Sequence, residues 1–193
     1  MMSKGEATKQ EILKHALILF STKGYEETSL KEIANRVNIK APSIYAYFSS
    51  KEELFESVTN NVMRDYHLFM RNQLSSLNMP SVEEKLYTLM EKLNKYFYDH
   101  ELGFFIKRYG VVPPEKFKDF MLQKYNESES EIRKLLYNIL ESESDKYVET
   151  ETIVTAFLCM LDGTLFYMVN FSTEEYERRL KISWEVFLRG IVK

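Results

Sequence analysis

Residues 28–51 read TSLKEIANRVNIKAPSIYAYFSSK and fit two short helices joined by a tight turn. The first half carries apolar residues at the spacing of one buried helical stripe, namely Leu30, Ile33, Ala34 and Val37. Ser29 and Glu32 have the spacing of a capping box, which predicts where the first helix starts. The segment therefore predicts a helix-turn-helix, the layout of many DNA-reading motifs.

The turn and the start of the second helix are also visible in the sequence. Asn38 tolerates the left-handed backbone conformation that ends a helix. Pro42 suits the first position of a helix, where its missing N–H costs nothing, so the second helix is predicted to begin near Ala41. A rotation of about 100° per residue places Ile44 and Phe48 on one side, where they are expected to pack against the first helix.

The opposite face of the second helix is free to meet a partner. Pro42 and Ala46 point most directly outward, with Ser43, Tyr45 and Tyr47 beside them. The tyrosines have two interpretations: they pack against neighbouring helices, or their hydroxyls bond phosphate oxygens of DNA. Because the centre of this face is apolar, we expect contact with thymine methyls, DNA shape and phosphate clamping to contribute much of the specificity.

Further helix-start signals flank the motif. Thr8 and Glu11 have capping-box spacing ahead of an apolar helical stripe that ends at Gly24. Ser50 and Glu53 predict the start of another helix, which would link the motif to the rest of the chain. The N-terminal part is therefore predicted to be a three-helix unit.

The stretch from about Thr8 to Phe55 resembles the DNA-binding domain of the TetR family of bacterial one-component regulators. The resemblance lies in Thr28-Ser29, Ile33-Ala34, Ile44-Tyr45-Ala46-Tyr47-Phe48 and Ser50-Lys51-Glu52-Glu53-Leu54. The chain departs from the common family pattern at Asn38 in the turn, at Lys40-Ala41-Pro42 and at Ala46 between the tyrosines. The resemblance implies phosphate contacts at the starts of the first motif helix and of the linking helix, and further contacts from the recognition helix. The expected DNA-binding residues are Thr28, Ser29, Lys40, Ala41, Pro42, Ser43, Tyr45, Ala46, Tyr47 and Lys51.

Charge and composition agree with this division. The chain has 193 residues and a net charge of −3, with about +3 in residues 1–51 and −6 in the remainder. This asymmetry favours DNA at the N-terminal end, and we expect a DNA-binding domain over residues 1–50 and a second domain over residues 51–193. Overall acidity argues against a protein that coats DNA nonspecifically by charge.

Beyond about residue 75 the pattern is almost wholly helical. Glycine is scarce and no alternation typical of strands persists, so the chain is expected to be all-α. The helices are predicted near residues 81–101, 103–109, 115–141, 149–171 and 173–191.

The last two helices are unusually apolar. The stretch 149–171 is apolar nearly all round, which requires cover on two sides. In the family, the final two helices of each subunit form a four-helix dimer bundle, and a dimer also supplies two DNA half-sites. The alternative is that both helices complete one monomer's core. The expected dimer residues are Phe157, Leu161, Leu165, Met168, Tyr176, Leu180, Trp184, Phe187 and Leu188.

The middle helices carry many large, adaptable side chains. They suit a pocket for an apolar or aromatic effector, although ordinary core packing is the alternative for each. The expected effector residues are Tyr87, Met90, Phe97, Phe104, Phe105, Tyr109, Phe120, Met121 and Tyr125. A polar group of the effector is expected to meet Glu91, Lys107, Arg108 or Asp162. By the resemblance, effector binding would shift the linking helix and release DNA, so the chain is expected to act as a repressor.

The single cysteine and the longest apolar run indicate in which cellular compartment the protein is expected. Cys159 excludes an internal disulfide and fits a reducing compartment, either as a small buried hydrophobe or as a redox sensor. Asp162 interrupts the apolar run from Ile153 to Phe171, which favours a helix buried in protein over a membrane span. We expect a cytoplasmic protein with no membrane partner.

Enzymatic chemistry has little support in the sequence. His15, His67 and His100 are far apart without metal-ligand spacing, and no phosphate-binding glycine loop or nucleophile-elbow motif is present. We therefore expect that the chain is not an enzyme and that it binds no metal and no cofactor. The expected function is a ligand-responsive, homodimeric regulator that binds a double-stranded palindromic operator. The alternative is a helical protein-interaction module that does not bind DNA.

Overall fold

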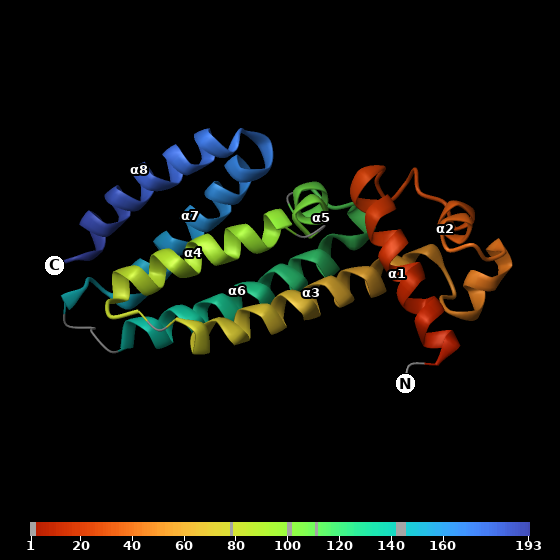
Figure 1. Ribbon diagram of the computed structural model, residues 1–193, viewed down its shortest axis with the longest axis horizontal. Coiled ribbons are helices and arrows are strands. Elements are labelled where there is room, and N and C mark those ends of the chain that lie inside the picture. Colours follow the sequence, from red (N-terminus) through yellow and green to blue (C-terminus); the bar gives the residue numbers. More distant parts are fainter. Residues whose placement is uncertain (1–2, 78, 100–101, 111, 142–145) are drawn as a thin grey trace. The chain divides into compact units, whose positions relative to one another are not determined.

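The computed structural model describes residues 3–77, 79–99, 102–110, 112–141 and 146–193. Over these residues the chain forms helices without a strand (Figure 1), so the predicted all-α class is confirmed. The elements are α1 Lys4–Thr22, α2 Leu30–Arg36, η1 Ala41–Ala46, α3 Lys51–Ser76, α4 Val82–Asp99, α5 Leu102–Tyr109, η2 Glu115–Phe117, α6 Lys118–Leu140, α7 Thr150–Asn170 and α8 Thr173–Ile191. His100 lies outside the described residues.

The chain divides into two compact units that are discontinuous in sequence. Unit 1 consists of Met1–Asp65 with Phe104–Met121, and unit 2 of Tyr66–Gly103 with Leu122–Lys193. A segment from the middle of the chain is thus part of the same compact unit as the helix-turn-helix. The functional boundary at residue 50 stays a prediction, because compactness alone does not define which residues bind DNA.

Helix α1 begins earlier than the sequence analysis predicted. Ser3 Oγ accepts the Glu6 N–H at 3.2 Å, and the Glu6 carboxylate accepts the Ser3 N–H at 2.7 Å. The predicted capping box at Thr8 and Glu11 is wrong, because Thr8 lies inside the helix and donates its hydroxyl to the Lys4 carbonyl at 3.0 Å. Ser3 offers the same capping chemistry five residues earlier.

The helix-turn-helix forms as the local signals indicate. Ser29 caps α2 by accepting the Glu32 N–H at 3.1 Å, and Asn38 has a φ of 62° in the left-handed region. Ile44 and Phe48 are buried as predicted. The second motif helix starts at Ala41 but is a 3₁₀-helix of six residues. An element this short contains few i→i+4 bonds and closes instead on tighter i→i+3 bonds.

Gly24 ends α1 in a conformation that other residues resist. Its φ is +101°, and a Cβ added there would lie 2.5 Å from Nη1 of Arg108, a residue of α5. We expect Gly24→Ala to lower the free energy of unfolding by about 1–3 kcal/mol through backbone strain. Chemical denaturation measures this loss. The control is Gly5→Ala in the same helix, where the nearest atom would be 4.0 Å away. Equal stability of both variants would contradict the assigned strain.

The core of unit 1 is a cluster of aromatic rings around Phe55 of α3. The centroid of this ring lies between 4.3 and 5.7 Å from those of Phe20, Tyr25, Phe105, Tyr109 and Phe117. The Tyr109 hydroxyl donates to the Phe20 carbonyl at 2.8 Å. Rings from α5 and η2 therefore complete the core of the unit that contains the helix-turn-helix.

In unit 2, α7 packs against both α4 and α8 (Figure 1). The amide of Asn94 donates to the Thr164 hydroxyl at 3.1 Å, and both side chains are buried. Helix α8 starts at Ser172, which accepts the Glu175 N–H at 3.3 Å as its sequence spacing predicted. These contacts fix the face that α7 turns toward the core.

Two features of α7 bear on the sequence expectations. Cys159 is exposed, so the expectation of a small buried hydrophobe is wrong. The reason is that α7 is apolar on nearly every face, whereas only one side of it packs against α4 and α8. Among the described residues, Thr150–Met168 is long and apolar enough to cross a membrane by length and composition alone. The core helix of a soluble protein meets the same criterion, so the length and composition of this helix are weak evidence for a membrane span.

Candidate nucleic-acid interface

The expected DNA-binding residues come from the start of α2, from η1 and its N-cap, and from the start of α3, all within unit 1. The exposed members are Ser29, Lys40, Pro42, Ser43, Tyr45 and Ala46, whereas Ala41, Tyr47 and Lys51 are partly buried. Tyr45 is 61% exposed, which makes its hydroxyl available to a partner. Tyr47 is less accessible, so the two tyrosines differ in their surroundings.

Thr28 and Ser29 have different roles in the structure. Thr28 is 1% exposed and donates its hydroxyl to the Gly24 carbonyl at 2.7 Å, which favours a structural role over a phosphate contact. Ser29 uses its oxygen to accept the Glu32 N–H, and its own hydroxyl hydrogen remains available to a phosphate oxygen. Of this pair, Ser29 is the better candidate for DNA contact.

Lys51 is held close to the motif by contacts within unit 1. Its ammonium group donates to the Glu26 carbonyl at 3.3 Å and lies 4.2 Å from the centroid of the Tyr25 ring. Desolvation lowers the pKa of Lys51, and the positive charge of Lys116 adds to this effect. The cation is thereby positioned at the N-terminal end of α3.

A second lysine in this region was not identified from the sequence. Lys116 of η2 donates to Glu52 Oε1 and to the Tyr25 hydroxyl, each at 2.9 Å. The Tyr25 hydroxyl in turn donates to Glu52 Oε1 at 2.8 Å. The hydrogen bonds from Lys116, followed by that from Tyr25, hold the pKa of Glu52 at about 2. Glu52 and Lys116 are 64 residues apart, and no periodicity or motif in the sequence links them.

The expected effector residues are divided between the two units. Phe104, Phe105, Tyr109, Phe120 and Met121 belong to unit 1, and Tyr87, Met90, Phe97 and Tyr125 to unit 2. In unit 1, Phe105 and Tyr109 pack around Phe55, whereas Phe104 is 60% exposed. Neither unit by itself brings the whole set together, and the assignment stays a prediction.

Unit 2 contains polar groups of the kind that orient a ligand. The Tyr66 hydroxyl is buried without a hydrogen-bond partner in the described part of the chain, and its ring lies 4.8 Å from that of Phe97. Tyr125 donates its hydroxyl to the Asp162 carboxylate at 2.9 Å. Desolvation raises the pKa of Asp162, and the hydrogen bond from Tyr125 opposes that rise.

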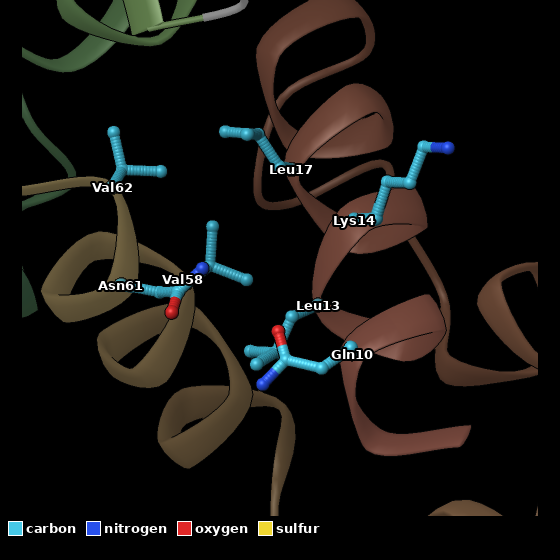
Figure 2. Close-up of a pocket in the computed structure, with 7 residues that line it drawn as sticks. All are labelled: Gln10, Leu13, Lys14, Leu17, Val58, Asn61 and Val62. Carbon is cyan, nitrogen blue, oxygen red and sulfur yellow. The ribbon is translucent and has the colours of Figure 1, made fainter. Parts of the chain in front are cut away.

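Unit 1 has a cavity of about 190 Å³ between α1 and α3. Figure 2 shows its apolar side chains coming from both helices. The lining residues are Gln10, Leu13, Lys14, Leu17, Val58, Asn61 and Val62. Engineered cavities of roughly this size hold benzene, and drug-sized ligands need larger ones. None of the expected effector residues lines this cavity.

The expected dimer residues are mostly used inside the chain itself. Six are buried, namely Phe157, Leu161, Met168, Leu180, Trp184 and Phe187, and Leu165, Tyr176 and Leu188 are partly buried. Side chains buried within one chain contribute little area to a contact with another, and the dimer role of these residues stays a prediction. Periodicity identified a stripe on each helix, but that stripe packs against the helices of its own unit.

A different stripe of α7 and α8 is exposed. On α7 it consists of Ala156, Cys159, Gly163 and Phe166, and on α8 of Ile182 and Val186. Phe166 is 59% exposed, Ile182 51% and Val186 67%. Spacings of three and four residues place the members of each stripe on one side of their helix. We call these six residues the α7–α8 stripe.

Comparison with known proteins agrees with the geometry of unit 1. Residues 12–58 match the model described as bacterial regulatory proteins, tetR family. The chain is 27% identical over 116 residues to the probable HTH-type transcriptional regulator YttP of Bacillus subtilis, covering 60% of this chain and 56% of YttP. It is 41% identical over 70 residues to IcaR of Staphylococcus aureus, the HTH-type negative transcriptional regulator of the biofilm operon icaADBC. That match covers 35% of this chain and 37% of IcaR, so the matched segments span about half of YttP and about a third of IcaR.

Solved structures extend the likeness of fold to the whole chain. A putative TetR-family regulator from Mesorhizobium loti has a TM-score of 0.77 at 20% identity, with 100% of each chain covered. FadR from Bacillus subtilis, solved with stearoyl-CoA, has a TM-score of 0.70 at 18% identity, covering 94% of this chain and 98% of FadR. At these identities the likeness shows the fold. The segment with the helix-turn-helix, residues 12–58, is thus similar to the tetR family of bacterial regulatory proteins.

Proposed function

We propose that the chain is a ligand-responsive transcriptional regulator that binds duplex DNA through unit 1. The observation that carries this proposal is the helix-turn-helix of the family domain, with Ser29, Tyr45 and Lys51 placed along its motif helices and at the start of α3. Hydroxyls and lysines bind phosphate oxygens and fix the orientation of a protein on DNA. The exposed Pro42 and Ala46 favour contact with thymine methyls and reading of DNA shape over many hydrogen bonds to bases.

The protein acts as a homodimer in this proposal. The α7–α8 stripe supports it, because it is an apolar surface on two adjacent helices, of the kind that mark protein interaction sites. A two-fold dimer presents the same patch from both copies and gives two recognition elements for a palindromic operator. Gly163 on α7 would allow two backbones to approach closely.

The effector is a small, largely apolar molecule that binds the helical part beyond residue 65. The aromatic and methionine side chains of unit 2, including Met90 and Phe97, support an apolar ligand. The unpaired Tyr66 hydroxyl and Asp162 would meet one polar group on it. Release of DNA requires only that the ligand prefer the arrangement that does not bind the operator. The chain is then a cytoplasmic repressor without a membrane partner.

The test is binding to duplex DNA from immediately upstream of the gene that encodes this chain. Lys51→Ala should weaken binding and reduce the slope of log affinity against log salt concentration by about one, because one phosphate contact is lost. The control is Lys134→Ala on α6 in unit 2, where the lysine pairs with Glu131 on its own helix. Affinities are measured by fluorescence anisotropy across a salt series.

Two outcomes would reject the proposal. A slope that Lys51→Ala leaves unchanged would argue that the start of α3 does not contact phosphate. Failure of the unaltered chain to bind any duplex selected from random sequences at low salt would favour the alternative, a helical protein-interaction module.

A further inference from the structure

Glu52 places a negative charge beside the lysine that is expected to contact DNA phosphate. It is the second residue of α3, directly after Lys51, and its side chain is 50% exposed. A carboxylate at this position repels DNA phosphate and attracts the neighbouring ammonium group. Like charge in an interface of this kind weakens association and suppresses binding of the partner.

The structure gives Glu52 a different cation as its partner. Lys116 Nζ lies 2.9 Å from Glu52 Oε1, and both groups share the Tyr25 hydroxyl. Lys116 Nζ also lies 4.1 Å from the centroid of the Tyr25 ring, near which the Lys51 ammonium group lies at 4.2 Å. The two lysines thus share one ring, but only Lys116 is hydrogen-bonded to the carboxylate.

Lys116 is presented by a firmly anchored segment. The neighbouring Phe117 is buried, and its ring stacks on that of Phe55 with centroids 4.3 Å apart. Earlier in the same segment, Tyr109 is bonded to the backbone of α1 through the Phe20 carbonyl. An anchored partner loses less side-chain entropy when it forms an ion pair than a freely moving one does.

We propose that Lys116 is a positioning residue for DNA binding, which holds the Glu52 carboxylate away from Lys51 and from the phosphate that Lys51 contacts. The inference rests on the proposed function, since it concerns the same phosphate contact. It assigns part of the DNA-binding machinery to η2, a segment 58 residues beyond the end of the family domain.

A double-mutant cycle tests this role with the same upstream duplex. Lys116→Met should weaken DNA binding about fivefold, the upper range for one partly exposed charge pair. In the Glu52→Gln background, where no carboxylate is left to restrain, Lys116→Met should change the affinity less than about twofold. Lys116→Arg keeps the charge and should bind within about twofold of the unaltered chain.

The cycle distinguishes positioning from simpler effects. A direct phosphate contact by Lys116, or a general effect of net charge, predicts the same loss in both backgrounds, and that result would overturn the inference. Lys118→Met removes an equal charge two residues away, from a side chain that is 65% exposed, and should change binding less than twofold. A fivefold loss in that variant would also overturn the inference.

Two further measurements separate the possible failures. Recovery of binding in the Glu52→Gln, Lys116→Met double variant excludes misfolding as the cause of the loss, and thermal melting of each variant checks it directly. If the unaltered chain binds DNA and Lys51→Ala weakens binding while Lys116→Met does not, this inference fails and the proposed function stands.

Discussion

Replacing Val186 by arginine should convert the protein from a dimer to a monomer and reduce operator binding by at least about 100-fold. Val186 is 67% exposed on α8, beside Ile182 in the α7–α8 stripe. Two-fold symmetry would bury both copies of the new guanidinium group, and an unpaired buried charge is very costly. A monomer has only one recognition element for two half-sites. Light scattering after size-exclusion chromatography measures the mass of the variant.

A matched control separates interface loss from general damage. Leu122 on α6 is 56% exposed and lies outside the α7–α8 stripe, so Leu122→Arg should remain dimeric and bind DNA normally. Thermal melting should show that both variants are folded. A Val186→Arg protein that keeps the mass of a dimer would show that the dimer uses another surface.

Replacing Phe55 by alanine should lower the free energy of unfolding of unit 1 by about 3–5 kcal/mol. The side chain is fully buried, and its removal leaves a cavity among rings that include Phe117 and Tyr109. Because this core belongs to the unit that contains the helix-turn-helix, DNA binding should be lost together with stability. Denaturation by urea, followed by tyrosine fluorescence and circular dichroism, measures the effect.

The same experiment tests whether the middle segment belongs to this core. Phe117→Ala should also destabilise the unit by about 3–5 kcal/mol, although it lies 59 residues beyond the end of the family domain. Tyr98→Ala is the control, since that aromatic side chain is 61% exposed and should cost little. A Phe117→Ala variant as stable as Tyr98→Ala would mean that η2 does not support the core around Phe55.

Local sequence signals predicted the helix-turn-helix well. The cap at Ser29, the left-handed turn at Asn38, and the buried pair Ile44 and Phe48 depend on neighbouring residues, so the sequence contains the relevant information. The start of α1 was misplaced because two sequences with capping-box spacing lie five residues apart and Ser3 begins the helix first. The 3₁₀ geometry of η1 was not predicted. An element of six residues can close few i→i+4 hydrogen bonds, so i→i+3 bonds are formed instead.

Features that depend on distant parts of the chain were not predictable in the same way. Helix α7 is apolar on almost every side, so periodicity could not tell which face packs inside the chain and which one remains exposed with Cys159. The residues expected at the dimer interface came mostly from the face that is buried within the chain. The pair of Glu52 and Lys116 links charged residues 64 positions apart, and many lysines in the sequence are equivalent by pattern alone.

The most direct test of the account is the number of chains bound to one duplex. Sedimentation of the 23.0 kDa chain with a labelled duplex from upstream of its own gene measures the protein mass in the complex. The account predicts two chains on each palindromic site, with both lost together when Val186 is replaced by arginine. A complex that contains a single chain, or no complex at low salt with any duplex tested, would contradict it.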